Sequence, residues 1–551
     1  MNLYKYVSDA INEKLGFEAK LEVPKNRDFG DFSTNAAMVG AKMAGKNPRE
    51  LANEYLPLLK ELDFVADVSV AGPGFINIKI KDDFILQNAS APKQINSEKS
   101  LKIDLDYGGY NIGKALHIGH LRTTIVGDTF NRIAKFIGHK TKSYNHIGDW
   151  GRPMGLVIAW ILEYGMPKDA ETLNTYYPLS SARAKEDEAW MQKARELTAK
   201  LQAGDPECRK IYEDFMKISL KQLDDILIRL NVMPFDATMG ERGVADYVSD
   251  TQKILENKHL LEESDGALIV PVKTESDNAP MPPLMFRTSS DTQTYAAADL
   301  TAIYYRTKTD NPDIIGYFTD SRQTLHFNQV FRAARLADLT SAQLFHTGFG
   351  AITGKDGKPF KTRDGGVASL TDILDTAKDA VNERIKESGK NLDEDTVNAI
   401  ALAAVKFNDL VHDVKSDYIF DPSSITSFEG KTGPYILYTA VRLNSVLKRA
   451  NADISKPEHF DLSIEERNLL IEIMDFEKTL LSAYENRATD MIANYAYDLC
   501  QLINNFYHNC PILRDDVPTD IKAGRLYIAK LAFDNLSTAI DLMGLKIPRE
   551  M

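Results

Sequence analysis

Cysteine is scarce in this chain, because only three of its 551 residues are cysteines, at positions 208, 500 and 510. Thiols so few and so widely spaced predict neither a disulfide framework nor a zinc site. The composition therefore favours a protein of the reducing cytoplasm without a structural metal.

Long apolar runs are also missing. No stretch approaches the roughly 18 residues that a helix needs to span a bilayer. The opening segment MNLYKYVSDAINEKLGF carries charges throughout and lacks the apolar core of a secretory signal. We therefore expect no association with a membrane.

An excess of positive charge is absent as well. The formal net charge is −13, which excludes a protein that coats nucleic acid as histones do. Binding of a shaped RNA stays open, because it depends only on a local basic surface. The hydrophobic content of 43% and the charged content of 26% are ordinary for a globular protein. The length predicts about three or four domains.

Four stretches of the chain differ in their patterns. Residues 1–95 mix helical segments with short strands, such as the alternating stretch 74–80, and a mostly polar linker follows at 86–100. Between 96 and 375, strands alternate with helical patterns, which predicts a doubly wound α/β domain with a largely parallel sheet. The expected strands are 101–105, 142–146, 267–272, 314–319 and 344–350.

Two further stretches are helical in pattern. Residues from about 170 to 265 are strongly charged, which predicts a helical insertion into the α/β domain. From 376 to 551 the strand signals stop, and we expect an all-α domain.

One motif stands out at the first strand-to-helix junction of the α/β domain. His117-Ile118-Gly119-His120 follows the strand 101–105 and opens a helix with apolar residues at helical spacing. A helix N-terminus offers free backbone N–H groups and a positive dipole end to phosphate. The two imidazoles can also donate hydrogen bonds, and Gly119 allows close approach. We expect a phosphate site here; the alternative is a pair of histidines that cap the helix.

A second candidate is the loop 354–363, directly after the expected strand 344–350. It contains Gly354, Lys355, Lys358, Lys361 and Arg363. A cationic loop with glycines suits a triphosphate whose pyrophosphate departs. The alternative is a solvated basic surface loop.

Together these motifs resemble the class I aminoacyl-tRNA synthetases, and the arginyl type most closely. His117-Ile118-Gly119-His120 is identical to the HIGH motif of that family. The segment 358–363, KPFKTR, lies where class I enzymes carry KMSKS, and this departure is typical of many arginyl enzymes. In those, a lysine just upstream of HIGH supplies the missing charge, which points to Lys114.

The resemblance extends over nearly the whole chain. Two departures are the swapped order of Arg549 and Glu550 near the end, and Tyr110 where many relatives have proline. The stretches that resemble the family are 29–35, 72–77, 145–151, 295–300, 326–329 and 432–442.

The family implies a three-part protein. The parts are an α+β N-terminal domain at 1–95, a Rossmann-type catalytic domain at 96–375 and an all-helical anticodon-binding domain at 376–551. It also implies a two-step reaction, in which arginine and ATP with Mg²⁺ form arginyl-adenylate and the tRNA then accepts the arginyl group. We expect a cytoplasmic monomer that activates arginine only with its tRNA bound.

Roles for individual residues follow from the same resemblance. The catalytic and ATP-binding residues would be Lys114, His117, Gly119, His120, Lys358 and Lys361. The arginine-binding residues would be Asp106, Asn111, Tyr295, Asp299 and Gln329. The tRNA contacts would be Phe75, Asn77, Tyr435, Tyr438, Arg442 and Tyr507.

The chemistry of arginine agrees with this pocket. A guanidinium is planar and permanently charged, so two carboxylates and an aromatic wall select it over lysine and citrulline. Taken alone, Asp106 could instead cap a helix, and Asp299 could lie on a solvated helix face.

Two other functions stay open. A cysteinyl-type synthetase would need zinc-binding cysteines, which the three scattered cysteines do not supply. A synthetase-like RNA-binding protein without catalysis would not need Lys114, His117 and His120, which are all present. Aminoacylation assays with arginine and cysteine tRNAs distinguish these alternatives.

Overall fold

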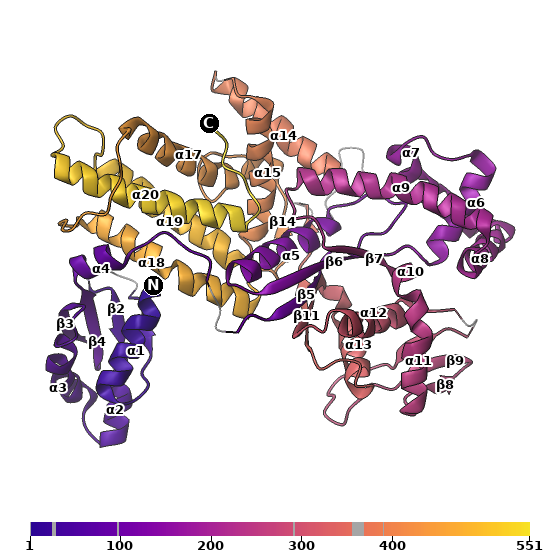
Figure 1. Ribbon diagram of the computed structural model, residues 1–551, viewed down its shortest axis with the longest axis horizontal. Coiled ribbons are helices and arrows are strands. Elements are labelled where there is room, and N and C mark those ends of the chain that lie inside the picture. Colours follow the sequence, from indigo (N-terminus) through magenta and orange to yellow (C-terminus); the bar gives the residue numbers. More distant parts are fainter. Residues whose placement is uncertain are drawn as a thin grey trace.

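The computed structural model of this chain describes residues 2–24, 29–95, 99–289, 292–354, 357, 368–389 and 391–551. Figure 1 shows an N-terminal sheet at one side, a central parallel sheet, and a helical bundle that runs above both. Within the described residues, no helix combines the length and the apolar composition needed to cross a bilayer.

The N-terminal part is a four-stranded antiparallel sheet with helices packed on it. The strand order is β1-β2-β4-β3, and the expected strand 74–80 is confirmed as the inner strand β4 (Phe75–Ile80). The other strands and helices are β1 (Leu21–Glu22), β2 (Phe32–Thr34), β3 (Val65–Ala71), α1 (Leu3–Leu15), α2 (Ala36–Ala44), α3 (Pro48–Lys60) and α4 (Asp82–Asn88).

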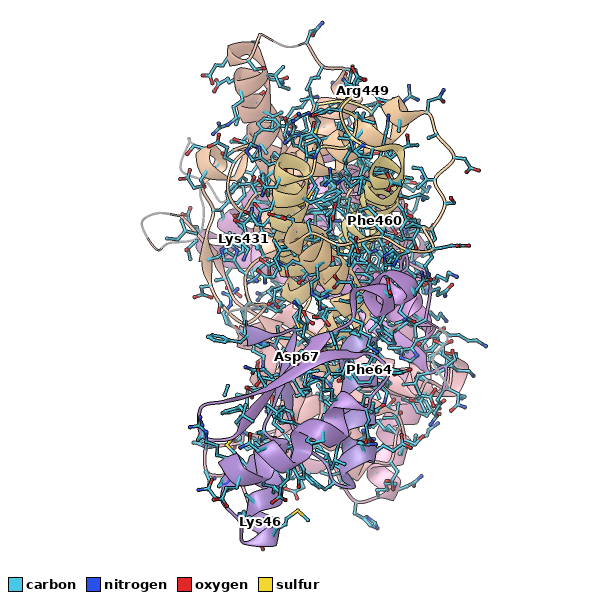
Figure 2. The ribbon with its side chains drawn as sticks, turned by 90° about the vertical axis from the view of Figure 1, so that its left-hand side faces the viewer. Lys46, Phe64, Asp67, Lys431, Arg449 and Phe460 are labelled. Carbon is cyan, nitrogen blue, oxygen red and sulfur yellow. The ribbon has the colours of Figure 1, made fainter. Side chains whose placement is uncertain are left out.

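This N-terminal part contacts the helical bundle through a buried arginine. Arg467 of α18 (Ile464–Asn486) forms ion pairs with Asp31, at 2.5 Å, and with Asp82, and it donates to the carbonyl of Ile80. Figure 2 shows the two parts one above the other, with Lys46 and Asp67 on the sheet domain and Lys431 and Arg449 on the bundle.

The central sheet has five parallel strands in the order β12-β11-β5-β6-β7. The expected strands 101–105, 142–146, 314–319 and 344–350 are confirmed in it. Chain order reverses between β5 and β11, which is the topological switch point where ligands bind in such sheets. The strands are β5 (Lys102–Asp106), β6 (Lys140–Ile147), β7 (Ala237–Gly240), β11 (Ile314–Asp320) and β12 (Gln343–Phe349). Helices α5 (Gly119–Phe136), α6 (Arg152–Tyr164), α12 (Tyr295–Thr309) and α13 (Thr324–Leu336) accompany them.

Two expectations about this region differ from the structure. The stretch 267–272 forms β9 (Ala267–Val270) of a separate antiparallel sheet, with β8 (Glu262–Ser264) and β10 (Leu284–Arg287). The expected insertion at about 170–265 begins with three helices, α7 (Ala170–Glu186), α8 (Glu188–Ala203) and α9 (Pro206–Arg229), but it is not entirely helical. Strand β7 then joins the parallel sheet, followed by α10 (Glu241–Val244) and α11 (Val248–Asn257). Strand β7 has only four residues, and so short a segment does not show the alternation of apolar and polar residues that predicts a strand.

The C-terminal part is a bundle of helices, as expected, with one small strand. β14 (Tyr418–Ile419) pairs in parallel with β13 (Ile352–Thr353), which follows the central sheet. Its helices are α14 (Leu370–Glu387), α15 (Glu394–Leu410), α16 (Pro422–Ile425), α17 (Gly433–Ala450), α18, α19 (Asp490–Asn509) and α20 (Thr519–Leu542).

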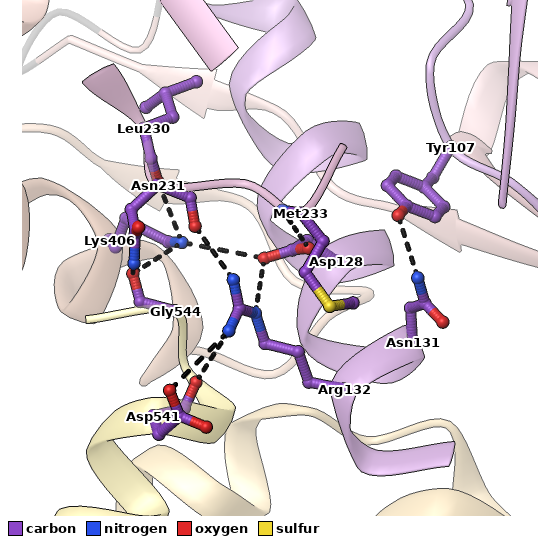
Figure 3. Close-up of polar contacts among 10 residues, drawn as sticks. All are labelled: Tyr107, Asp128, Asn131, Arg132, Leu230, Asn231, Met233, Lys406, Asp541 and Gly544. Atoms are coloured by element: carbon purple, nitrogen blue, oxygen red, sulfur yellow. Dashed lines mark hydrogen bonds and ion pairs between the residues drawn. The ribbon is translucent and has the colours of Figure 1, made fainter. Parts of the chain in front are cut away.

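A buried polar cluster joins the bundle to helix α5 (Figure 3). Lys406 of α15 is fully buried and donates to the carbonyls of Leu230 and Gly544, at 3.1 and 3.2 Å. Its Nζ also lies 4.0 Å from the buried carboxylate of Asp128 on α5, which accepts from Arg132 at 2.9 Å. The end of the insertion, the end of α20, α15 and α5 therefore meet at one point.

Candidate active site

The turn between β5 and α5 carries most of the predicted site. After β5 ends, the segment around Asn111 forms a parallel bridge with Gly148 at the end of β6. Gly109 and Gly113 take left-handed φ angles of 67° and 72°, which glycine adopts without strain. The turn therefore lies at the carboxyl ends of the strands, beside the switch point.

The backbone at the start of α5 differs from the expectation of free N–H donors. The N–H of Ile118 donates to the carbonyl of Ala368, and that of His120 donates to the carbonyl of His117. Those of Gly119 and Leu121 donate to the ring of His117 and the carbonyl of Ile118. A phosphate at this helix end would therefore meet side-chain donors first.

The rings of His117 and His120 lie next to each other, with centroids 4.0 Å apart and planes tilted by 34°. His117 Nδ1 accepts the N–H of Gly119, and His120 Nδ1 accepts the N–H of His117, both at 3.1 Å. Because each Nδ1 is an acceptor, the proton of the neutral ring is on Nε2. A Cβ on Gly119 would lie 2.9 Å from His117 Cε1, so a side chain there would displace that ring.

Both histidines are held neutral. Burial, together with the charges of Lys114 and Arg322, lowers the pKa of His117. Burial, His117 and Lys114 lower the pKa of His120 to about 3. The pair therefore presents neutral Nε2–H donors at physiological pH, which can bind phosphate oxygens without a change of protonation.

Lys114 belongs to the same cluster, since its charge acts on both imidazoles. Its Nζ lies 4.2 Å from the ring centroid of Tyr177 on α7. The structure thus brings together Lys114, His117, Gly119 and His120. The predicted Lys358 and Lys361 lie outside the described residues.

A half-buried carboxylate lies on α12, across the switch point. Asp299 Oδ2 is 2.6 Å from His326 Nε2, and Asp299 Oδ1 is 3.9 Å from His146 Nε2. Burial opposes ionisation of Asp299, but the hydrogen bond with His326 and the nearby His146 outweigh it and lower its pKa. Tyr295, which is 61% exposed, lies over His326 with ring centroids 4.5 Å apart. An ionised acid with an aromatic neighbour is what a guanidinium requires.

Sequence reasoning missed other acids of this region. Burial raises the pKa of Glu241, and the nearby charges of Asp149 and Asp299 raise it further. Asp149 accepts the Tyr212 hydroxyl at 2.7 Å, which links the site to the insertion helix α9. His146 and Asp149 lie in the stretch 145–151, and its resemblance to the family was the only indication in the sequence that they belong to the site. Glu241 directly follows strand β7, which the sequence did not predict because the surrounding residues have a helical pattern.

Asp106 has an ion-pair partner within the chain. Its Oδ2 lies 2.5 Å from Arg306 Nη2, and both side chains are buried. Arg306 comes from α12 and lies between the rings of Tyr144 and Tyr317. The carboxylate at the end of β5 is therefore neutralised in part by the chain's own guanidinium.

The other two predicted arginine-binding residues border the same region. Asn111 is exposed at the bridge to Gly148. Gln329 donates through Nε2 to the carbonyls of Pro282 and Pro283, at 2.8 and 3.1 Å, which leaves its oxygen as the acceptor.

The predicted RNA contacts divide between the two outer parts. Phe75 is half-buried in β4, whereas Asn77 is only 6% exposed inside the sheet. On α17, Tyr438 is exposed, and Tyr435 accepts from Gln501 and Asn504 at 2.8 Å.

The two remaining RNA candidates contact each other. The Arg442 guanidinium lies 3.6 Å from the ring centroid of Tyr507, which joins α17 to α19. One face of the Tyr507 ring is therefore covered by a cation of the chain.

Three family models together match most of the chain. Residues 83–422 match "tRNA synthetases class I (R), catalytic domain". Residues 436–551 match "DALR anticodon binding domain", and residues 1–80 match "Arginyl tRNA synthetase N terminal domain". The parallel sheet with paired histidines at its switch point is thus the catalytic domain of a class I aminoacyl-tRNA synthetase.

Curated relatives specify the amino acid. An arginine–tRNA ligase from Alkaliphilus oremlandii is 36% identical and covers 99% of this chain and 98% of its own length. One from Shewanella denitrificans is also 36% identical, over 97% of this chain and 96% of its own length. The chain belongs to the arginyl-tRNA synthetase family.

Solved structures agree with the fold. Arginyl-tRNA synthetase from Plasmodium falciparum superposes with a TM-score of 0.84 at 24% identity, over 100% of this chain and 99% of its own. The Thermus thermophilus enzyme gives 0.84 at 22% identity, with both chains covered completely. The protein therefore uses ATP to attach arginine to tRNA by the two-step reaction of class I synthetases.

Proposed function

We propose that Lys114, His117 and His120 bind the phosphates of ATP, and that Lys358 and Lys361 act on the departing pyrophosphate. The neutral His117–His120 pair, with both Nε2–H groups available, is the observation that supports these roles most directly. Attack by the arginine carboxylate on the α-phosphate needs no enzyme nucleophile, so these side chains act by positioning and by stabilising charge.

Mg²⁺ would accompany the triphosphate. Among the described residues, no cluster of three His, Cys, Asp or Glu side chains is suited to a metal ion. When bound, Mg²⁺ would neutralise phosphate charge, and its ligands would be phosphate oxygens and water.

For arginine, we assign the guanidinium to Asp299 with Tyr295 beside it. Asp299 has a lowered pKa and a half-buried side chain, so a charged ligand there gains a strong hydrogen-bonded ion pair. Asn111 and the Gln329 oxygen would bind the α-amino and carboxylate ends. Asp106 would add to the negative electrostatic potential of the arginine pocket, and its ion pair with Arg306 would reduce that contribution.

We assign each domain to one part of the tRNA. Domain 1–95 would contact the elbow, domain 96–375 the acceptor end, and domain 376–551 the anticodon. Phe75, Tyr438 and Arg442 are placed to stack on bases or to contact the backbone. Asn77, Tyr435 and Tyr507 would support them from within the sheet and bundle. We assign the enzyme to the cytoplasm as a monomer.

The test is a comparison of wild type with His120→Ala. Loss of one phosphate donor should lower adenylate formation by about 10²- to 10³-fold, while the Kd for arginine changes little. Single-turnover adenylate formation and equilibrium arginine binding measure the two quantities. Equal single-turnover rates would exclude the role of His120.

The tRNA requirement has a separate test. Arginine-dependent exchange of pyrophosphate into ATP should be negligible until arginine tRNA is added. Exchange at a comparable rate without tRNA would contradict that requirement, and a cysteine tRNA serves as the control.

A further inference from the structure

The helical insertion contacts the turn that carries Lys114 from two of its helices. Tyr177 of α7 has its ring centroid 4.2 Å from Lys114 Nζ. On α9, Ser219 Oγ accepts the N–H of Gly113 at 3.4 Å. The insertion is therefore in contact with the catalytic turn itself.

The surroundings of Lys114 are unusual for a lysine. Among the residues that the structure describes, no carboxylate lies within 4 Å of its Nζ, and its polar partner is the face of the half-buried Tyr177 ring. A cation within about 6 Å of a ring centroid is attracted by the ring quadrupole. The Tyr177 ring can orient the Lys114 ammonium without neutralising its charge. A carboxylate in the same place would form an ion pair with the ammonium and so compete with phosphate.

The helix that carries Tyr177 is fixed on both sides of the ring. Tyr176 donates its hydroxyl to the carbonyl of Gly165, and Ser180 donates to the carbonyl of Leu156 at 2.7 Å. Asn174 donates to Gln222 of α9 at 3.3 Å. The ring therefore belongs to a rigid support rather than to a loop.

We propose that Tyr177 is a positioning residue, which directs the Lys114 ammonium toward His117 and His120 and so gives the helical insertion a part in ATP activation. This role rests on the proposed function of Lys114 in binding phosphate. A lysine side chain has four rotatable bonds, and a ring that restricts them lowers the entropy lost when phosphate binds.

The experiment compares Tyr177→Leu with Tyr177→Phe in pyrophosphate exchange with arginine tRNA present. Tyr177→Leu should lower kcat/KM for ATP by about 3- to 30-fold, with KM for arginine unchanged. Tyr177→Phe keeps the ring and should stay within about twofold of wild type. Leu179→Ala, at an exposed position of α7, is the matched control. Wild-type kinetics in a folded Tyr177→Leu, or an equal rise in KM for arginine, would overturn the proposal.

Lys114→Met separates this inference from the proposed function beneath it. If Lys114→Met leaves kcat/KM for ATP unchanged, the assignment of Lys114 fails; if it lowers that value and Tyr177→Leu does not, the assignment of Tyr177 fails. In the Lys114→Met background, Tyr177→Leu should add no further loss. A full additional loss there would show that Tyr177 acts only on the structure of the insertion, and would overturn the proposal.

Discussion

At the scale of single residues, local hydrogen bonds decide what the side chains of the site can do. His117 and His120 are identifiable in the sequence, but which ring nitrogen carries the proton depends on the backbone N–H groups that donate to each Nδ1. In the same way, Asp106 and Asp299 are two similar acids in the sequence. Arg306 pairs with Asp106 and His326 pairs with Asp299, and this difference is the basis for our proposal that Asp299 is the principal acid for a guanidinium.

Asp299→Asn tests this assignment. The substitution removes the negative charge and should raise KM for arginine by about 10- to 100-fold, because hydrogen bonds between charged groups contribute roughly 1.5–3 kcal/mol. KM for ATP should change little. Steady-state aminoacylation measures both values. Asp534→Asn, which breaks an ion pair with Lys530 on α20 of the helical bundle, is the control, and an unchanged KM for arginine in Asp299→Asn would contradict the prediction.

At the scale of elements, one arginine of α5 connects the catalytic helix to a strand pair. Arg122 is 1% exposed and donates to the carbonyls of Gly350 and Ser416, at 3.0 and 2.8 Å. Gly350 follows β12, and its N–H donates to the carbonyl of Val414 at 3.0 Å. The chain segments around 350 and 416 therefore approach closely enough for β13 and β14 to pair.

Gly350→Ala should disrupt this approach. An added Cβ would lie 2.4 Å from backbone atoms of Ser416, which cannot rotate away, so the free energy of unfolding should fall by about 1–3 kcal/mol. Thermal unfolding measures the loss. Gly151→Ala is the matched control, since its nearest neighbour would be 3.4 Å away. Equal midpoints for the two variants would refute the expected clash.

At the scale of the whole molecule, the catalytic domain and the helical bundle share a buried charged cluster (Figure 3). Burial lowers the pKa of Lys406 to about 8, although Asp128 nearby favours its charge. A buried ammonium costs stability, and Lys406 offsets part of that cost through two hydrogen bonds, to the end of the insertion and the end of α20, and through the charge of Asp128 on α5 at 4.0 Å.

Lys406 should leave a pH signature on stability. Its pKa is lower in the folded chain than in the unfolded one, so between about pH 8 and 10.5 the unfolded chain binds more protons, and stability rises with pH. The free energy of unfolding of wild type relative to Lys406→Met should therefore rise over this window, by up to about 3 kcal/mol. Calorimetry of both proteins at pH 7, 8, 9 and 10 measures the difference. A constant difference would contradict the prediction.

Much of the fold could be predicted because its signals are local. The apolar alternation of β4, the strands β5, β6, β11 and β12, and the amphipathic helices of the bundle are each visible over a few residues. β7 and the separate sheet that contains β9 were missed, because pairing partners far along the chain decide where a short strand lies.

The amino-acid sequence by itself determined the order of the elements, the position of the paired histidines at the head of a helix, and the resemblance to arginyl enzymes, since these depend on neighbours along the chain. Only the tertiary structure decided which acid meets Arg306, which nitrogen of each histidine carries the proton, and that Tyr177 lies beside Lys114. Those outcomes depend on burial and on contacts between distant segments, and both arise only when the chain folds.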